Sequence, residues 1–228
     1  MFTRWFLVGD LIFLGCSEDE YEEFWSDYFD MKTDYSQITN INGDAFLGRA
    51  IKFGDGIRIL RQDLFETIIS FIISQRKNIT SIRLSVDLLC RRFGEKFKGI
   101  GVNANEVDAY AFPTSKALAS ASIEELAECG LGYRTRYIKA AAEWFLEWER
   151  CKRDLSYDIL VNEIMGVGAK VASCICLFGL HQLEFCPIDV WVKRIFDEEY
   201  SGQIPEWATS KFAGVYQQYC FYYKRSTT

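Results

Sequence analysis

Apolar residues recur with helical spacing along most of the 228-residue chain. In the segment 79–93, Ile82 and Leu89 fall on one face and Arg83 on the other, which predicts an amphipathic helix. The segment 65–73 just before it is almost wholly apolar and predicts a buried central helix. These two segments indicate a protein built mainly from helices.

Further helices are expected where similar patterns follow a capping residue or a glycine turn. Their expected ranges are 43–53, a short helix from Ser122 closed by Gly130, 132–148, 154–163, 169–180, a helix from Asp189, and 207–223. A capping box at 17–20 opens one more, acidic helix. Its aromatic face is expected to pack in the core and consists of Tyr21, Phe24, Trp25, Tyr28 and Phe29.

Strand patterns are confined to the first sixteen residues, where 5–14 is expected to form a strand or hairpin with a possible tight turn at Gly9 and Asp10. We therefore expect an all-α fold with a short N-terminal β remnant in residues 1–16 and a helical domain in residues 17–228.

A glycine turn stands between two of the expected helices. Gly166 and Gly168 let the backbone turn tightly, and the helix that follows presents free amides that suit a phosphate. Lys170 lies on the first turn of that helix, where the helix dipole favours a neutral, nucleophilic amine. Asp189 follows Pro187 and is expected to cap the next helix. A plain turn beside an exposed lysine would show the same residues, so the spacing alone leaves both interpretations open.

The hairpin, the lysine and the aspartate resemble the helix-hairpin-helix (HhH-GPD) DNA glycosylases, the superfamily of endonuclease III and the 8-oxoguanine DNA glycosylases. In that family the hairpin binds a DNA phosphate, the lysine attacks the sugar carbon that bears the damaged base, and the aspartate assists. The resemblance implies that Lys170 and Asp189 are catalytic. It also implies that Gly166, Gly168 and Val171 contact DNA.

Three further segments, 130–137, 170–174 and 213–221, resemble the 8-oxoguanine DNA glycosylases in particular. The resemblance implies that Tyr133 and Arg134 enter the gap left by a flipped base. It assigns the base pocket to Cys174, Phe178, Pro187, Gln217 and Phe221. Singly, Cys174 and Phe221 would each be interpreted as core residues.

The chain also departs from that family. Arg76, Lys77 and Asn78 stand where the family has three asparagines, and the resemblance implies that they contact DNA. The other differing positions are Ser81 in place of a second arginine, Trp191 in place of a histidine and Met165 in place of a proline. The N-terminal antiparallel domain is expected to be largely missing, and weaker selectivity for 8-oxoguanine over guanine is expected to follow.

The chain is acidic as a whole, so a DNA-binding surface is expected only where positive residues are concentrated. The net charge is −6, but residues 75–140 carry eleven Lys and Arg against seven Asp and Glu. This excess lies just before the hairpin and suits a DNA-facing surface. A solvated helix face would give the same excess.

No cofactor is expected, apart from a monovalent cation that the hairpin carbonyls could hold. The eight cysteines form no C-x-x-C pair, and only Cys220 follows Asp189, which excludes the four-cysteine iron–sulfur loop of endonuclease III. His181 is the only histidine and is expected in a loop, so a zinc site is unsupported.

The sequence therefore predicts a base-excision-repair DNA glycosylase with AP lyase activity, which removes 8-oxoguanine from double-stranded DNA through a lysine Schiff base. Two alternatives stay open: a monofunctional glycosylase for alkylated bases, which uses water and needs no amine, and a non-catalytic helix-hairpin-helix DNA-binding module. We expect a monomer without a membrane segment, because no apolar run reaches roughly 18 residues. Its expected location is cytoplasmic and nucleoid-associated in a bacterium, or nuclear in a eukaryote.

Overall fold

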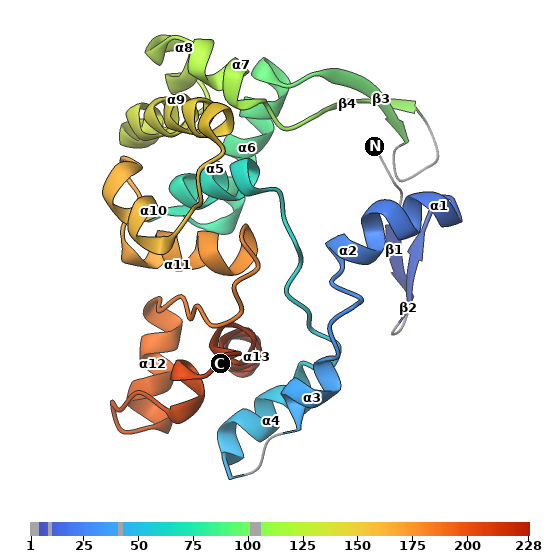
Figure 1. The fold of residues 1–228 in the computed structure, drawn as a ribbon, viewed down its shortest axis with the longest axis vertical. Coiled ribbons are helices and arrows are strands. Elements are labelled where there is room, and N and C mark those ends of the chain that lie inside the picture. The colour runs from blue at the N-terminus through green and yellow to red at the C-terminus, as the bar shows by residue number, and fades with distance from the viewer. Residues whose placement is uncertain (1–4, 9–10, 41–42, 101–105) are drawn as a thin grey trace. The chain divides into compact units, whose positions relative to one another are not determined.

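The computed structural model describes residues 5–8, 11–40, 43–100 and 106–228. Most of them are helical, which confirms the expected all-α class (Figure 1). The strands are β1 (Trp5–Val8), β2 (Leu11–Leu14), β3 (Lys96–Ile100) and β4 (Glu106–Tyr110). The α-helices are α1 (Glu18–Glu20), α2 (Ser26–Tyr28), α3 (Tyr35–Thr39), α4 (Ala45–Phe53), α5 (Leu64–Ser74), α6 (Ile79–Phe93), α7 (Ser115–Ser120), α8 (Ile123–Ala127), α9 (Thr135–Cys151), α10 (Tyr157–Glu163), α11 (Ala169–Phe178), α12 (Val190–Glu199) and α13 (Ala213–Thr227). Tyr21–Trp25 forms a π-helical turn, and Gly132–Arg134 and Glu206–Thr209 form 3₁₀ turns.

The chain folds into two compact units. The first contains the chain up to Asp27 together with Ile72–Lys152, and the second contains Tyr28–Phe71 and Arg153–Thr228. The boundary between the two units falls inside α5, between Phe71 and Ile72, so each unit contains part of that helix.

In the first unit, α7 and α8 pack along the long helix α9 (Figure 1). Ile138, Ala142 and Phe145 bury the inner face of α9. The helix begins after the 3₁₀ turn, because Gly130 and Gly132 hold the backbone at φ values of 67° and 59°. These left-handed conformations suit glycine.

The first unit also contains a hairpin that the sequence analysis missed. β3 and β4 pair antiparallel with Lys96 opposite Tyr110, and the Asp108 carboxylate binds Lys96 at 2.7 Å and Lys98 at 3.0 Å. The expectation that strands are confined to the first sixteen residues is therefore wrong. The alternation of charged and apolar residues in both strands was a strand signal, but their high charge hid it.

The N-terminal strands are confirmed, with Trp5 opposite Leu14. The turn expected at Gly9 and Asp10 lies outside the described residues. The capping box is also confirmed, because Ser17 Oγ accepts a hydrogen bond from the Glu20 amide at 3.2 Å.

The aromatic face expected to follow that capping box is not buried as a whole. Phe24 is 50% exposed, because the π-helical turn has more residues per turn and shifts later side chains off the predicted stripe. The C-terminal helix also differs from the expectation: a 3₁₀ turn precedes α13, which begins at Ala213 rather than near residue 207.

In the second unit, α4 and α12 pack against α13, and α10 packs against α11. The tyrosines of α13 tie it to distant loops: Tyr216 donates to the carbonyl of Ile38 at 2.8 Å, and Tyr219 donates to that of Ile57 at 3.1 Å. The core buries Tyr35, Ile38, Phe46, Leu47, Ala50, Ile59, Leu177, Val192, Ile195, Phe196, Trp207, Val215, Tyr216, Tyr219 and Cys220.

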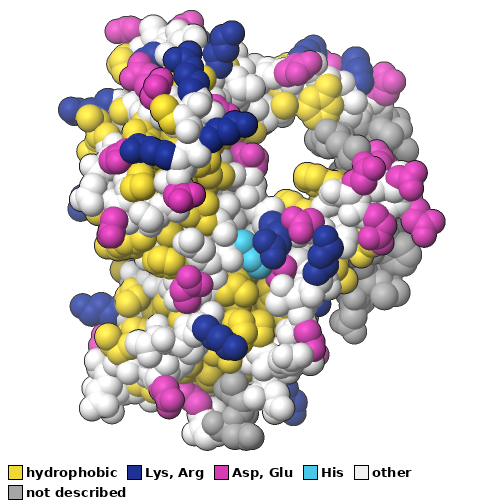
Figure 2. All heavy atoms as spheres, in the orientation of Figure 1, with side chains coloured by type: hydrophobic (Ala, Val, Ile, Leu, Met, Phe, Trp, Pro, Cys, Tyr) yellow, Lys and Arg dark blue, Asp and Glu magenta, His cyan; other side chains and the backbone are white. Residues whose placement is uncertain are grey.

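The surface carries charges of both signs. On the face drawn in Figure 2, Lys and Arg side chains over α7, α8 and α9 alternate with Asp and Glu side chains. The positive excess of this stretch therefore forms no continuous basic patch on that face. Among the helices that are described, none combines the length and the apolar character that a membrane crossing requires.

Candidate active site

The predicted hairpin joins α10 to α11 in the second unit. Gly166 has a φ of 87°, a left-handed conformation, and the Val167 amide donates to the Ile164 carbonyl at 3.0 Å to close the turn. Gly168 is the N-cap of α11 in extended conformation and makes no side-chain cap, so the first amides of α11 face outward. Apart from Gly168 itself and its two chain neighbours, no heavy atom of the described residues lies within 4 Å of the point where a Cβ of Gly168 would stand. This helix start therefore has both the donors and the space for a phosphate.

Lys170 lies on the first turn of α11, and its side chain is exposed. It lies beside the thiol of Cys174, which is one helical turn further along and only 2% exposed. Burial raises the pKa of the Cys174 thiol, the Lys170 side chain lowers it, and the charge of Asp189 raises it. The structure thus brings together Lys170, Cys174 and Asp189. Because burial dominates, Cys174 is a protonated thiol at neutral pH and a wall of the site rather than a nucleophile.

Asp189 caps α12, as the sequence predicts. Its Oδ1 accepts hydrogen bonds from the amides of Trp191 and Val192, both at 2.9 Å. In the part of the chain that the structure describes, no hydrogen bond reaches Oδ2. The cap therefore fixes the carboxylate and leaves one oxygen to face a ligand.

The residues predicted for the base pocket lie on three elements of the second unit. Cys174 and Phe178 belong to α11, Pro187 is buried in the loop before α12, and Gln217 and Phe221 belong to α13. Gln217 is 3% exposed, and its Oε1 accepts from Gln218 Nε2 at 2.6 Å. Phe221 is half-buried and lies 5.9 Å from the Arg225 guanidinium.

Gly214 is the point at which these three elements meet. Its amide donates to the Leu183 carbonyl at 2.8 Å. A Cβ at this position would lie 2.4 Å from Leu177 Cδ1 and 2.4 Å from the Phe185 carbonyl oxygen. The close approach that glycine allows therefore fixes α13, with Gln217 and Phe221, against α11 and the loop.

The predicted DNA-contacting residues of the first unit are partly turned inward. Arg76 is exposed, and Asn78 caps α6 by accepting from the Ser81 amide at 2.8 Å. Lys77 instead donates to Ser85 Oγ and to the Gly130 carbonyl.

The two residues expected to enter DNA differ in exposure. Tyr133 is 47% exposed, whereas Arg134 is 5% exposed and donates to the carbonyls of Leu131 and Gln75. The Arg134 guanidinium lies 4.3 Å from the centre of the Tyr133 ring. In this conformation Tyr133 is the residue accessible to DNA, and the DNA contact of Arg134 stays a prediction.

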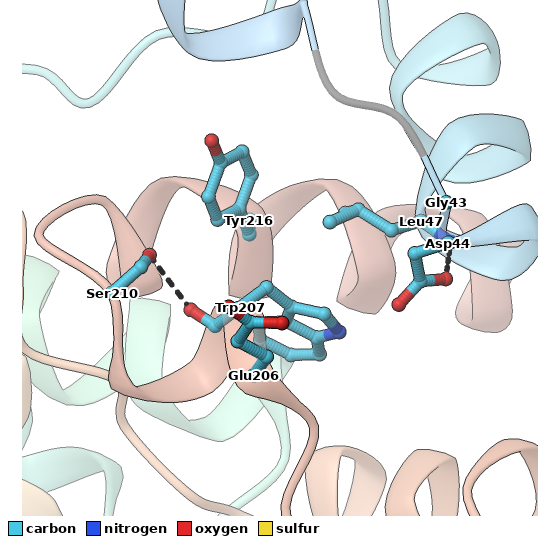
Figure 3. A pocket seen from close by; sticks show the side chains of 7 residues that line it. All are labelled: Gly43, Asp44, Leu47, Glu206, Trp207, Ser210 and Tyr216. Atoms are coloured by element: carbon cyan, nitrogen blue, oxygen red, sulfur yellow. Dashed lines mark hydrogen bonds between the residues drawn. The ribbon is translucent and has the colours of Figure 1, made fainter.

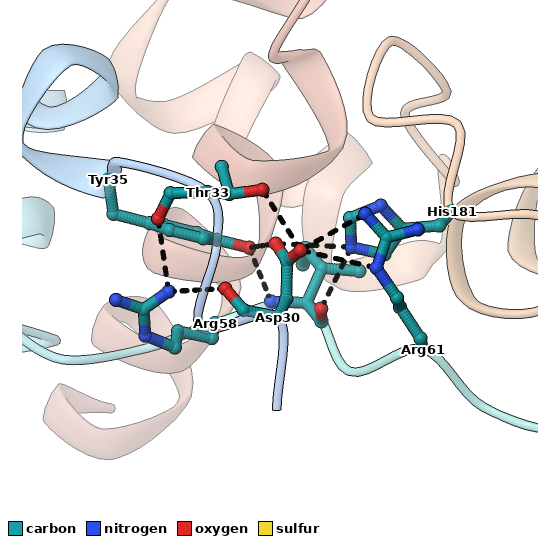
Figure 4. Close-up of polar contacts among 7 residues, drawn as sticks. Asp30, Thr33, Tyr35, Arg58, Arg61 and His181 are labelled. Atoms are coloured by element: carbon teal, nitrogen blue, oxygen red, sulfur yellow. Dashed lines mark hydrogen bonds and ion pairs between the residues drawn. The ribbon is translucent and has the colours of Figure 1, made fainter. Parts of the chain in front are cut away.

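Two further groups of the second unit escaped the sequence analysis. Phe71 of α5 stacks on Phe178 with ring centres 5.6 Å apart. Asp30, which is 1% exposed, accepts hydrogen bonds from Thr33, Tyr35 and Arg61 (Figure 4). No local pattern marks Asp30 as a charged cluster, because its charged neighbours are distant in sequence. Arg61 is 31 residues from Asp30, and His181 is in the loop after α11.

His181 is in a loop, as expected. Its Nε2 lies 3.1 Å from the Ile59 carbonyl oxygen and 3.3 Å from the Asp30 carboxylate. Both neighbours are acceptors, so Nε2 carries the proton. Within the described residues, no group of three or more His, Cys, Asp and Glu side chains could hold a metal ion.

A separate hollow of about 450 Å³ lies in the second unit (Figure 3). It is lined by Gly43, Asp44, Leu47, Glu206, Trp207, Ser210 and Tyr216. Asp44 is already bound there, since it accepts from the Leu47 amide at 2.8 Å and from the Tyr200 hydroxyl at 2.9 Å. The hollow contains no amine nucleophile and none of the predicted site residues.

Comparison with known proteins groups this chain with DNA repair enzymes. Residues 13–68 match the family described as 8-oxoguanine DNA glycosylase, N-terminal domain. Residues 69–206 match the HhH-GPD superfamily base excision DNA repair protein family. The two matches meet between residues 68 and 69, whereas the division at residue 16 rests on the strand pattern alone and stays a prediction.

Individual relatives agree with the family matches. The N-glycosylase/DNA lyase of Saccharomyces cerevisiae is 38% identical over 163 residues, which are 64% of this chain and 42% of that protein. The solved structure of MBOgg1 with a low-affinity DNA ligand has a TM-score of 0.86 at 33% identity and covers 99% of this chain and 82% of its own. The 8-oxoguanine glycosylase/lyase of Clostridium acetobutylicum, solved with DNA containing cytosine opposite 8-oxoguanine, has a TM-score of 0.84 at 30% identity, covering 99% and 82%. The chain spans between 42% and 62% of the length of the curated relatives it matches.

Proposed function

The chain belongs to the HhH-GPD superfamily of base excision DNA repair proteins, and on that premise we propose that it is an 8-oxoguanine DNA glycosylase with AP lyase activity. The observation that carries the proposal is the meeting of Lys170, Cys174 and Asp189 directly behind the open amides of α11. An amine, a carboxylate and a phosphate-binding helix start are the groups that this reaction needs. A surface ion pair would not require the glycine hairpin.

Lys170 supplies the nucleophile of the proposed reaction. The lone pair of its unprotonated amine forms a bond to C1′ of the nucleotide while the bond from C1′ to the base breaks. The base leaves with the bonding electrons and takes up a proton. Opening of the sugar ring gives a Schiff base, from which loss of a C2′ proton and of the 3′ phosphate cleaves the strand.

Asp189 acts on charge rather than as a nucleophile. As the base departs, positive charge develops on the sugar, and a carboxylate fixed by two backbone amides can stabilise it without reorganising. Cys174, a buried neutral thiol beside Lys170, offers an apolar surface to the extruded base. Phe178, Pro187, Gln217 and Phe221 are proposed to complete the base pocket.

Double-stranded DNA with a damaged base is the proposed substrate. The target bond is out of reach inside a duplex, so the nucleotide must be extruded, which costs a few kcal/mol. The exposed ring of Tyr133 can stack in the gap and offset part of that cost. The hairpin around Gly168 and the segment with Arg76, Asn78 and Arg134 are proposed to bind the backbone. We propose that the protein acts as a monomer. A monovalent cation bound by the hairpin carbonyls could assist phosphate binding.

Trapping with borohydride tests the proposal, because borohydride reduces the Schiff base and links the chain covalently to DNA. The wild-type chain should be trapped on duplex with 8-oxoguanine and on duplex with an abasic site. Lys170→Gln should bind both and be trapped on neither, whereas Lys193→Gln, an exposed lysine on α12, should behave as wild type.

The other outcomes identify the alternatives. Base excision without any trapping would overturn the lyase proposal and favour the monofunctional glycosylase. Binding without excision or trapping would favour the non-catalytic module. Trapping that persists in Lys170→Gln would remove Lys170 from the nucleophile's role.

A further inference from the structure

A half-buried lysine, Lys77, joins two loops of the first unit. The loop between α5 and α6 contains Arg76, whose φ of 51° is left-handed, so the chain turns sharply before Lys77. The Lys77 Nζ then donates to Ser85 Oγ at 2.7 Å and to the Gly130 carbonyl oxygen at 2.7 Å. The Ser85 hydroxyl lies 3.3 Å from the same carbonyl oxygen. One ammonium therefore connects the α5–α6 loop, α6 and the turn before α9.

The turn that Lys77 holds is the one that carries Tyr133. Gly130 and Gly132 both have positive φ, and glycine gives a backbone more freedom than any other residue. Without outside contacts this turn would sample several conformations. A second clamp, from Arg134 to the carbonyls of Leu131 and Gln75, fixes its far end.

The positive charges of Lys77 and Arg134 lie close together, which lowers the stability of the first unit. Burial lowers the pKa of Lys77, and the neighbouring Arg134 charge lowers it further. Within the described residues, neither cation has a carboxylate in salt-bridge contact, and the buried Arg134 Nε has no hydrogen-bond acceptor. Two adjacent cations without a carboxylate partner repel each other, so the arrangement serves the geometry of the turn more than the stability of the unit.

We propose that Lys77 is a positioning residue for Tyr133: its bonds to Ser85 and Gly130 hold the turn so that the Tyr133 ring is presented to DNA. This inference rests on the proposed function, in which Tyr133 fills the gap left by the extruded nucleotide. Lys77 touches neither the base nor the sugar in this account. It lowers the ordering cost of the turn before DNA arrives.

Lys77→Met tests the inference, because it keeps the length of the side chain and removes every donor. Hydrogen exchange of residues 130–134 in the free protein should become faster by about tenfold, the effect of losing roughly one charged hydrogen bond. The equilibrium constant for nucleotide extrusion, measured by the fluorescence of 2-aminopurine placed beside the lesion, should fall by about tenfold. Thermal stability should change little, because the lost bonds are offset by relief of the repulsion from Arg134.

Two controls separate positioning from a general charge effect. Arg83→Met removes one exposed positive charge from α6 and should leave extrusion at the wild-type level. Lys77→Arg restores a donor and should recover part of the signal. In the double variant Lys77→Met with Tyr133→Ala, extrusion should be no weaker than in Tyr133→Ala alone, because a positioning residue acts only through its target.

The abasic duplex keeps this test distinct from that of the proposed function. Trapping on it requires Lys170 but no damaged base to extrude, so Lys77→Met should be trapped within about twofold of the wild-type rate. Wild-type extrusion and exchange in Lys77→Met, or additive losses in the double variant, would overturn the positioning role. Absence of wild-type trapping would instead count against the proposed function, and the exchange comparison would still decide whether Lys77 orders the turn.

Discussion

The Nζ atom of Lys170 lies 5.4 Å from the centre of the Phe71 ring. That ring in turn stacks on Phe178 with an angle of 15° between the planes. The proposed nucleophile therefore rests on an aromatic pair contributed by α5 and α11. The ring face attracts the ammonium and packs against the apolar stem of the lysine.

Phe71→Leu should slow Schiff-base formation by about three- to tenfold, because loss of the stacked aromatic pair, which contributes about 0.5–1.5 kcal/mol, leaves the stem of Lys170 less firmly positioned. The measurement is single-turnover trapping at saturating abasic duplex. Phe145→Leu, the same change in the buried face of α9, should lower the melting temperature without altering that rate. A wild-type trapping rate in Phe71→Leu would show that the ring does not hold Lys170.

Phe221→Ala should weaken binding of lesion DNA by about 1–3 kcal/mol if the ring stacks on the extruded base. Its effect on the free energy of unfolding should be small, because Phe221 is half-buried and lies outside the core cluster. Phe46→Ala, which empties a core position, should instead cost about 3–5 kcal/mol of stability. Lesion affinity and urea unfolding measured side by side decide the role, and equal stability losses in both variants would assign Phe221 to the core.

Gly214→Ala should destabilise the second unit by about 1–3 kcal/mol, because the new methyl group would overlap Leu177 and the rigid Phe185 carbonyl. Gly48→Ala is the matched control. Gly48 lies inside α4 with no atom within 4 Å of the added Cβ, so this change should stabilise the helix by about 0.5–1 kcal/mol. Urea denaturation should move the two midpoints in opposite directions. A shift in the same direction would mean that the loop yields around residue 214.

Local patterns predicted the helices well and the tertiary features poorly. The bounds of α6 agree with the prediction because Asn78 caps its start and Gly94 follows its end, both local signals. Phe24 was misplaced because a single π-helical turn changes the register, which the apolar spacing does not show. The β3–β4 hairpin was missed because the charged residues in both strands hid their alternation with apolar residues.

Asp30→Asn should lower the free energy of unfolding by about 1–3 kcal/mol, because the amide can only partly replace the buried carboxylate that accepts from Thr33, Tyr35 and Arg61. Asp34→Asn is the control. Asp34 is the exposed cap of α3, and Asn caps a helix about as well as Asp, so that change should leave the free energy of unfolding near the wild-type value. Equal effects would show that the Asp30 cluster is not a fixed point of the second unit.

Cys174 should resist iodoacetamide at pH 8, at which exposed Cys151 is modified, because the raised pKa keeps the buried thiol protonated. The sign for stability follows. Below the ordinary pKa of 9.0 the thiol is protonated in both folded and unfolded chains, and as pH rises through the raised folded value stability is lost. Lys170→Gln should raise the pKa of Cys174 further, since Lys170 lowers it. Mass spectrometry of labelled peptides checks both points, and early labelling of Cys174 would contradict them.

The placement of Lys170 and Asp189 could be predicted from sequence, because both residues stand at helix starts. Lys170 follows the glycine hairpin and Asp189 caps α12, so each carries a local signal. The inward positions of Lys77 and Arg134 could not be predicted, because their acceptors are backbone carbonyls of distant loops, and any residue type supplies a carbonyl. Phe71 gave no signal for the same reason: its apolar neighbours on α5 look alike in sequence.

The open space beside Gly168 separates two kinds of indispensable residue. Gly214 is needed for packing within the chain, because a methyl group there would overlap Leu177 and the Phe185 carbonyl. A methyl group at Gly168 would contact no described residue beyond its chain neighbours and would meet only a bound partner. A survey of substitutions scored by melting temperature would thus flag position 214 and pass over position 168. A survey scored by survival under oxidative DNA damage would flag both. The difference between the two surveys, taken across the whole chain, would outline the nucleic-acid footprint without a bound complex.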